Sequence, residues 1–184
     1  MTNNRQAITW TPPSGLYNAA VDMIDRNIAE GRGAKLALVD PKTQLTYAQL
    51  AERVDRFANA IPRLGIGRER RIALIMLDTA QLPVAFWGAI KAGVVPIPIN
   101  TLLPPETWRY MIEDSRAAAV VISDELYDRA AHVLEEIQQR RHLHVIIDDR
   151  PGDQKLISLS ALTANSAPPA SAVDTHADDV AFWL

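Results

Sequence analysis

The sequence contains no cysteine among its 184 residues. This absence excludes a disulfide framework, thiolate catalysis and cysteine-ligated metal sites, and it agrees with a reducing cytosol. Long apolar runs are also missing, because Lys91, Pro96 and Pro98 interrupt the most apolar stretch. A membrane span needs ~20 apolar residues, and the first residues lack the basic and apolar regions of a signal peptide. We therefore expect a cytoplasmic protein without a membrane partner.

Glycine-rich phosphate loops and a charge excess of one sign are absent as well. None of the 8 glycines forms a dinucleotide fingerprint or a P-loop. The net charge is -3 with both signs interspersed, which makes nucleic acid an unfavourable partner. His142 and His144 could share one face of a strand, but a third metal ligand at a helpful spacing is missing. We expect neither a metal site nor a catalytic residue in this chain.

Apolar runs that alternate with helical patterns dominate what is present. The run at 71–77 predicts a strand covered on both faces. Helices are expected between successive strands, and this alternation with short links predicts an α/β fold with a doubly wound parallel sheet. Further strands are expected at 94–99, 118–122 and 145–148.

The first sixty residues add local signals of their own. A helix is expected over 18–30, followed by a strand at 35–40 with its hairpin partner at 44–46. Thr46 and Gln49 have the spacing of a capping box, which predicts the start of the next helix. Pro62 predicts a kinked last turn for that helix.

Prolines and acidic residues predict three more boundaries. Asp78 is placed to cap the helix that precedes Lys91. Pro96 and Pro98 remove two donors from one side of their strand, so we expect that side to remain unpaired or the strand to end early. Pro104 opens a helix that turns Trp108 inward.

The chain divides into three parts on composition. Residues 1–163 are expected to form one N-terminal α/β subdomain, and residues 164–177 are small, polar and proline-containing, as in a linker or surface loop. Residues 178–184 resemble the opening of a buried strand that is cut short. A natural terminus normally frays into water, so we expect more chain to follow in the parent protein.

Several stretches resemble the adenylate-forming enzymes of the acyl-CoA synthetase superfamily. Residues 45–50 (LTYAQL) resemble the L-T-Y-x-E-L signature, with Gln49 where Glu is common, and residues 91–100 (KAGVVPIPIN) resemble K-A-G-x-x-x-x-P-x-N. The stretches at 18–19, 25–35, 86–90, 100–101, 109–110 and 113–116 resemble the benzoate–CoA ligase branch.

This resemblance implies the N-terminal subdomain of the adenylate-forming enzyme fold and a two-step reaction. A carboxylate, here benzoate or a related aryl acid, attacks the α-phosphate of ATP with Mg²⁺, and coenzyme A then displaces AMP. In the family the phosphate-binding loop and the catalytic lysine follow the segment that matches 181–184. The resemblance therefore implies that this chain alone is inactive and binds no cofactor, and that its partner is the remainder of the same polypeptide.

The resemblance places one family site within the chain. Relatives often carry an arginine for a phosphate of coenzyme A two residues after the asparagine matched by Asn100, but this chain has Leu102 there. Arg109 could substitute, although a solvated arginine on a helix face is the alternative. The neighbourhood of the coenzyme A site implied by the resemblance is therefore Asn100, Thr101, Leu102 and Arg109.

Two alternatives remain open at this point. A straight-chain fatty-acid or other carboxylate-adenylating enzyme is the nearer one, because the pocket that would decide the substrate is absent. A non-catalytic flavodoxin-like binding or interaction module is the more distant one. A homodimer is compatible with either.

Overall fold

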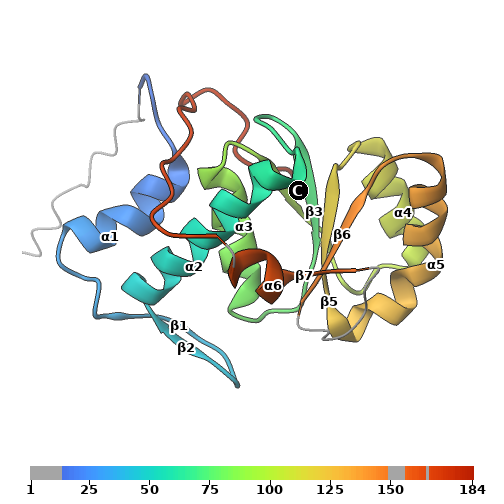
Figure 1. Cartoon of the computed structure of the whole chain (residues 1–184), viewed down its shortest axis with the longest axis horizontal. Coiled ribbons are helices and arrows are strands. Elements are labelled where there is room, and N and C mark those ends of the chain that lie inside the picture. Colours follow the sequence, from blue (N-terminus) through green and yellow to red (C-terminus); the bar gives the residue numbers. More distant parts are fainter. Residues whose placement is uncertain (1–13, 149–155, 165) are drawn as a thin grey trace, which may run out of the picture.

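A five-stranded parallel sheet with helices on both faces forms the centre of the molecule (Figure 1). The computed structural model describes residues 14–148, 156–164 and 166–184. The sheet has the spatial order β4-β3-β5-β6-β7, and all its pairs are parallel. Its strands are β3 (Arg71–Ile75), β4 (Val95–Pro98), β5 (Ala119–Ser123), β6 (His144–Asp148) and β7 (Ile157–Ser158). The predicted α/β class with a parallel sheet is confirmed.

The order of the strands shows that the sheet is doubly wound. The chain passes from β3 to β4 at the edge, and then crosses back over β3 to form β5 on its other side. This reversal places a topological switch point between β3 and β5, the position where open parallel sheets bind ligands beyond the carboxyl ends of their strands. The same order occurs in flavodoxin-like folds.

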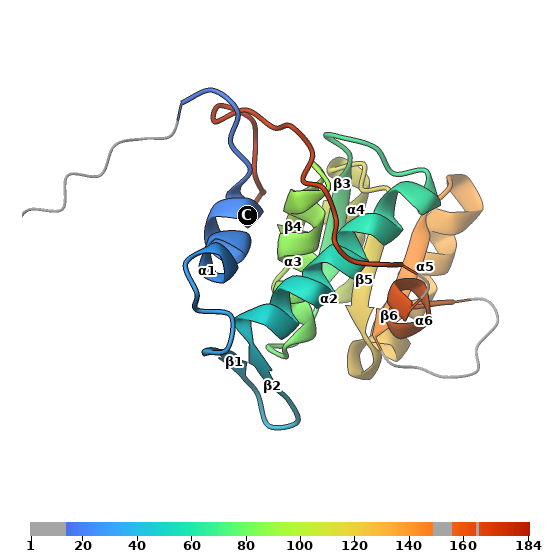
Figure 2. The same ribbon diagram turned by 60° about the vertical axis from the view of Figure 1, so that its left-hand side comes forward.

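Each face of the sheet has its own apolar core (Figures 1 and 2). Helices α2 (Tyr47–Ala60), α3 (Gln81–Lys91) and α6 (Leu159–Ala164) cover one face, and α4 (Pro105–Asp114) and α5 (Asp124–Arg140) cover the other. Because both faces are covered, the strands are almost wholly apolar, as β3 and β5 illustrate. Fully buried core side chains include Phe57, Ile72, Leu74, Trp108, Ile122 and Ile146.

The N-terminal elements pack beside α2 and α3 (Figure 2). The helix expected over 18–30 is present as a π-helical turn, η1 (Val21–Asp25), followed by the short α-helix α1 (Arg26–Ala29). Strands β1 (Leu36–Val39) and β2 (Gln44–Thr46) form the expected antiparallel hairpin.

Two local predictions for α2 are confirmed. Thr46 Oγ1 accepts a hydrogen bond from the Gln49 N–H at 3.3 Å, and Gln49 Oε1 accepts one from the Thr46 N–H at 2.9 Å. The helix tightens into the 3-10 turn η2 (Ile61–Leu64), which contains Pro62, and ends at Gly65 with φ +72°. A left-handed residue at this position favours glycine.

The proline-containing strand lies at the edge of the sheet, as predicted. The N–H groups of Val95 and Ile99 donate to Arg70 O and Leu74 O beside β3. Residues alternate in direction along a strand, so Pro96 and Pro98 face outward. The outward Pro96 carbonyl accepts a hydrogen bond from the Trp183 N–H at 3.1 Å.

The prediction for Asp78 is wrong. Helix α3 begins at Gln81 with Ala80 as its N-cap residue, and Asp78 is exposed. The Ala80 N–H instead donates to Asp40 Oδ2 at 2.7 Å, from a residue forty positions earlier. A distant carboxylate from the β1–β2 hairpin therefore takes the place of the local cap.

The last part of the chain wraps the subdomain without forming a strand. Residues 178–184 contain no strand, and Phe182, Trp183 and Leu184 are exposed, so the buried strand expected there is not formed in this chain. The segment expected as a linker or surface loop packs back on the helices within its described residues. Asn59 Nδ2 donates to Ala167 O at 2.6 Å, and the Val173 N–H donates to Lys91 O at 2.9 Å.

A buried ion cluster joins the N-terminal helix to the covering helices. Lys91 at the end of α3 is only 3% exposed, and its Nζ lies 2.7 Å from Asp25 Oδ2 and 2.5 Å from Asp55 Oδ1. Its side chain turns inward because two carboxylates supply the partners that a buried charge requires.

Candidate functional site

The candidate site is the carboxyl edge of the parallel sheet, on the side where β3, β4 and β5 end. At the switch point, the N–H of Leu77 after β3 donates to Ser123 Oγ at the end of β5, at 2.9 Å. Ser123 immediately precedes α5, but its side chain makes no cap hydrogen bond to that helix. Its hydroxyl joins the ends of two neighbouring strands instead.

The carboxylate of Asp40 fixes the turn between β3 and α3. Its Oδ2 accepts from the Ala80 N–H, and its Oδ1 accepts from the N–H groups of Lys42 and Thr43 at 2.7 and 2.6 Å. These hydrogen bonds lower the pKa of Asp40, and the bond from the Ala80 N–H has the largest effect. The carboxylate therefore satisfies a free N–H at the start of α3 and binds the hairpin to this edge of the sheet.

The loop after β4 contains three of the four residues that the resemblance singled out. Asn100 Oδ1 accepts a hydrogen bond from the Leu102 N–H at 2.9 Å, which closes a tight turn. The side chain of Leu102 is 86% exposed. Thr101 contributes its carbonyl, which accepts from Arg129 at 3.3 Å. Asn100, Thr101 and Leu102 therefore lie together at the carboxyl end of β4.

Two side chains from the helices below hold this loop. The Nε1 of buried Trp108 donates to Asn100 O at 3.0 Å. The guanidinium of Arg129 donates to Thr101 O and Leu103 O, and it lies 4.5 Å from the centre of the Trp108 ring. Side chains of α4 and α5 therefore support the backbone of this loop in the conformation described.

Arg109 does not bond to this loop in the structure. Its guanidinium bonds to Glu106 on its own helix and to Glu136 on α5, the latter at 2.8 Å. Burial disfavours the charge of Arg109, but the hydrogen bond and charge of Glu106 and the charge of Glu136 outweigh it, so its pKa is raised. A role for Arg109 in coenzyme A binding would require it to leave both carboxylates.

The two histidines at the start of β6 pair with each other. The Nε2 of His144 lies 2.9 Å from both His142 Nε2 and the Leu64 carbonyl oxygen. A carbonyl only accepts, so His144 Nε2 carries the hydrogen. Burial, followed by the nearby His142, lowers the pKa of His144, while the Leu64 carbonyl opposes this effect.

No candidate metal site emerges from the described ranges. Within residues 14–148, 156–164 and 166–184, no three His, Asp or Glu side chains gather where they could hold a metal ion. In the same ranges, no helix combines the length and apolarity that crossing a bilayer requires.

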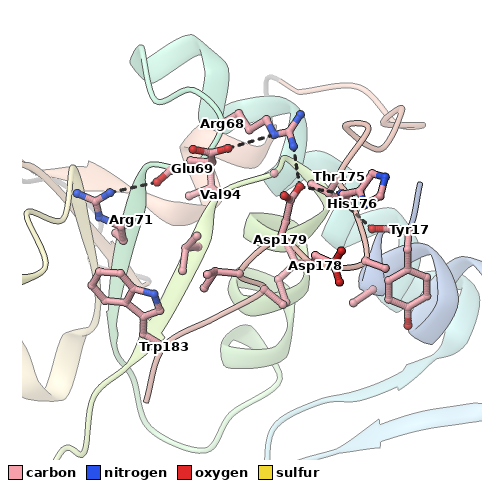
Figure 3. A pocket seen from close by; sticks show the side chains of 17 residues that line it. Tyr17, Arg68, Glu69, Arg71, Val94, Thr175, His176, Asp178, Asp179 and Trp183 are labelled. Atoms are coloured by element: carbon pink, nitrogen blue, oxygen red, sulfur yellow. Dashed lines mark hydrogen bonds and ion pairs between the residues drawn. The ribbon is translucent and has the colours of Figure 1, made fainter. Parts of the chain in front are cut away.

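A pocket of about 410 Å³ lies at the opposite, amino end of β3 and β4 (Figure 3). Both of its arginines already have partners. Arg68 bonds to Asp179 at 2.6 Å, and Arg71 donates to Ser115 O at 2.7 Å while lying 5.6 Å from the centre of the Trp183 ring. The pocket therefore lies at the contact between the C-terminal segment, residues 175–183, and the amino ends of β3 and β4.

With this geometry in place, comparison with known proteins identifies the family. A protein-family model described as "AMP-binding enzyme" matches residues 25–184. The chain belongs to the AMP-binding enzyme family. This result confirms the resemblance that residues 45–50 and 91–100 indicated.

Curated relatives in the AMP-binding family include aryl-CoA ligases. A 4-hydroxybenzoate–CoA/benzoate–CoA ligase of Rhodopseudomonas palustris is 42% identical over 167 residues, which are 91% of this chain and 30% of the relative. A benzoate–CoA ligase of Thauera aromatica is 40% identical over 179 residues, 95% of this chain and 33% of the relative. A long-chain-fatty-acid–CoA ligase of Escherichia coli O157:H7 is 32% identical over 139 residues, 75% of this chain and 24% of the relative. The chain spans about a third of the length of these aryl-CoA ligases.

Solved structures of AMP-binding enzymes share the fold. A benzoate CoA ligase from Burkholderia xenovorans LB400 is 40% identical with a TM-score of 0.82, covering 92% of this chain and 32% of that one. An anthranilate CoA ligase in complex with anthranoyl-AMP is 27% identical with a TM-score of 0.80, covering 89% of this chain and 31% of that one. The subdomain fold predicted from the sequence is therefore confirmed.

The sequence did not reveal the role of Arg129 in this site. It belongs to α5, more than twenty residues after the loop that it holds, and no local pattern connects the two. Trp108 was predicted to face inward, which it does, but its bond to Asn100 had no signal in the sequence. A side-chain bond to a distant carbonyl depends on how α4 and α5 pack, which periodicity does not specify.

Proposed function

We propose that this chain is the N-terminal part of an ATP-dependent benzoate–CoA ligase, or of a ligase for a closely related aryl carboxylate. The observation that supports this most is the identity of 42% and 40% to two benzoate–CoA ligases over nearly the whole chain. The fatty-acid ligase matches at 32% over three quarters of it. The aryl branch is therefore the better-supported substrate class.

The proposed reaction has two steps, an attack of the carboxylate on the α-phosphate of ATP and the displacement of AMP by the thiol of coenzyme A. ATP and Mg²⁺ supply the activated phosphoryl group and the charge neutralisation that such a transfer needs. No described side chain of this chain is placed to do this chemistry. Within the proposal the groups that hold ATP and Mg²⁺ belong to another part of the full-length polypeptide.

This chain contributes structure to that reaction. The Ser123–Leu77 bond and the three bonds of Asp40 fix the strand ends and the turn before α3. The loop at 100–103 presents Leu102 beyond the end of β4. We assign this loop to the border of the coenzyme A site, and the other subdomains would complete the pocket for the aryl acid.

Substrate-dependent ATP–pyrophosphate exchange by the full-length polypeptide tests the proposal. Benzoate, 4-hydroxybenzoate, 3-hydroxybenzoate and a long-chain fatty acid are compared, with an assay lacking acid as the control. We expect the highest kcat/KM with benzoate or 4-hydroxybenzoate. A higher value with the fatty acid would reject the aryl class, and no acid-dependent exchange at all would reject the ligase function.

A further inference from the structure

The loop of residues 100–103 has an unusual number of side-chain bonds to its backbone. Trp108 Nε1 donates to the Asn100 carbonyl at 3.0 Å. Arg129 donates to the Thr101 carbonyl at 3.3 Å and to the Leu103 carbonyl at 2.8 Å. Three of the four carbonyls in this exposed loop therefore accept hydrogen bonds from side chains of α4 and α5.

Arg129 is suited to this task by its shape. A planar guanidinium has donors on several sides, so it can bond to two carbonyl oxygens at once, whereas a lysine ammonium acts as a compact point charge. The same plane covers the ring of Trp108, with the guanidinium carbon 4.5 Å from the ring centre, and this cation–π contact adds to the hydrogen bonds. Arg129 thus joins the loop, α4 and α5 through one group.

The result of these bonds is a defined direction for Leu102. Its N–H is engaged by Asn100 Oδ1, and its side chain is 86% exposed. The loop lies at the carboxyl end of β4, next to the switch point between β3 and β5. Ligands of open parallel sheets bind beyond this edge, so the bonds hold a potential ligand-facing surface in place.

Arg109, the other arginine near this loop, is engaged elsewhere and does not hold the loop. Arg109 bonds to Glu106 and Glu136. Arg129 bonds to backbone carbonyls that carry no net charge, and among the described groups it is the arginine that contacts the loop directly.

We propose that Arg129 is a positioning residue, which fixes the loop of residues 100–103 for coenzyme A binding and has no part in forming the acyl-adenylate. This inference rests on the proposed ligase function. It assigns the effect of Arg129 to the second step alone, because the proposed function puts this loop at the border of the coenzyme A site.

Steady-state kinetics of the full-length polypeptide test this assignment. In Arg129→Met, we expect the KM for coenzyme A to rise about fivefold or more, as a displaced binding loop produces. Benzoate-dependent ATP–pyrophosphate exchange without coenzyme A should stay within about twofold of wild type. Arg140→Met is the matched control, because Arg140 is an exposed arginine of the same helix that pairs with Glu113 and Glu136 and not with the loop. Its KM for coenzyme A should not change.

Arg129→Lys separates position from charge. Lysine keeps the charge but cannot bridge two carbonyls, so the KM should rise nearly as much as in Arg129→Met. A wild-type KM in Arg129→Lys would overturn the positioning role in favour of a simple charge effect. An unchanged KM in Arg129→Met, or an equal loss in the exchange reaction, would also overturn the proposal.

Amide hydrogen exchange in the 184-residue chain provides a readout that does not depend on activity. The amides of Leu102 and Leu103 should exchange faster in Arg129→Met and at the wild-type rate in Arg140→Met. Unchanged exchange in Arg129→Met would mean that Arg129 does not hold the loop. If wild-type full-length protein makes acyl-adenylate but consumes no coenzyme A, the ligase function and the coenzyme A role fail together, while faster amide exchange would still establish the bonds of Arg129 to the loop.

Discussion

The ammonium group of Lys91 lies 2.5 Å from the carboxylate of Asp55, inside the interface between α3 and α2. Asp25 approaches the same ammonium group from the N-terminal helix at 2.7 Å. Three elements that are far apart in the sequence therefore meet at one buried cation. The cluster fixes how the N-terminal segment docks on the helices that cover the sheet.

Removing the cation should destabilise the chain strongly. In Lys91→Ala, buried Asp55 loses the charge that compensates it, and breaking such a pair costs about 3–5 kcal/mol. Urea unfolding should show a lower midpoint with an unchanged slope. In Lys91→Met/Asp55→Leu both buried charges are gone, so much of the stability should return. A double variant as unstable as Lys91→Ala would show that the cluster acts through packing rather than charge.

The contribution of Asp40 to the stability of the fold should depend on pH. Its pKa lies below the ordinary 3.8, chiefly because the Ala80 N–H donates to it. A lowered folded-state pKa means that the contribution is complete above 3.8 and is lost as the pH falls through the lower folded value. Asp40→Asn should therefore be less stable than wild type near neutral pH, and the difference should shrink in acid.

Thermal unfolding of both proteins at steps from about pH 6 to about pH 2 measures this convergence. Glu135→Gln, a change of an exposed carboxylate on α5, is the control for general effects of charge. A difference between Asp40→Asn and wild type that stays constant over this range would contradict the carboxylate's role at the start of α3.

Helices α2 and α3 approach each other closely at Gly88. A methyl group on Gly88 would lie 2.8 Å from Phe57 Cδ1 and 3.0 Å from the Val54 carbonyl oxygen. Gly88→Ala should therefore cost about 1–3 kcal/mol through overpacking. Gly67→Ala is the matched control, because nothing lies within 4 Å of a methyl group there. Equal urea midpoints for the two variants would show that the helices can separate without cost.

Position 102 should accept a charged side chain. Leu102 is almost fully exposed, so Leu102→Arg should not affect folding. In the full-length polypeptide it should lower the KM for coenzyme A, because an arginine can make a charge-assisted bond to a phosphate. Benzoate-dependent pyrophosphate exchange should not change. A KM for coenzyme A equal to that of wild type would remove position 102 from the proposed site.

The isolated 184-residue chain should neither bind ATP nor catalyse pyrophosphate exchange. Its described residues offer no group of metal ligands, and its sequence has no phosphate-binding glycine loop. Calorimetric titration with ATP and Mg²⁺, with an exchange assay in parallel, measures both properties. Exchange above background in the purified chain would contradict the prediction.

Local signals were the part of the fold that the sequence predicted well. Thr46 and Gln49 are three residues apart, and Pro96 and Pro98 act on the strand that contains them. Each prediction therefore depends only on residues that are close together in the sequence. The predicted capping box and edge strand are confirmed for this reason. The cap predicted at Asp78 was wrong because Asp40, from the β1–β2 hairpin, accepts the hydrogen bond of the Ala80 N–H instead.

Contacts between distant residues were the part that the sequence could not reveal. Lys91 meets Asp55 and Asp25, which lie 36 and 66 positions away. Arg129 reaches a loop 26 to 28 positions away. Such contacts depend on the crossing of helices and on the register of the sheet. The site residues Asn100, Thr101, Leu102 and Arg109 came from the family resemblance, and their role in coenzyme A binding stays a prediction.

The two prolines of β4 also limit how copies of this protein can assemble. The outward side of β4 offers carbonyl groups but no N–H groups, and its Pro96 carbonyl already bonds to the Trp183 N–H. Two β4 edges placed together would oppose acceptor to acceptor, so a sheet cannot continue between two molecules through paired β4 edges. A homodimer that extends the sheet through two β4 edges is therefore disfavoured, and the two prolines protect this edge against pairing with its own copy.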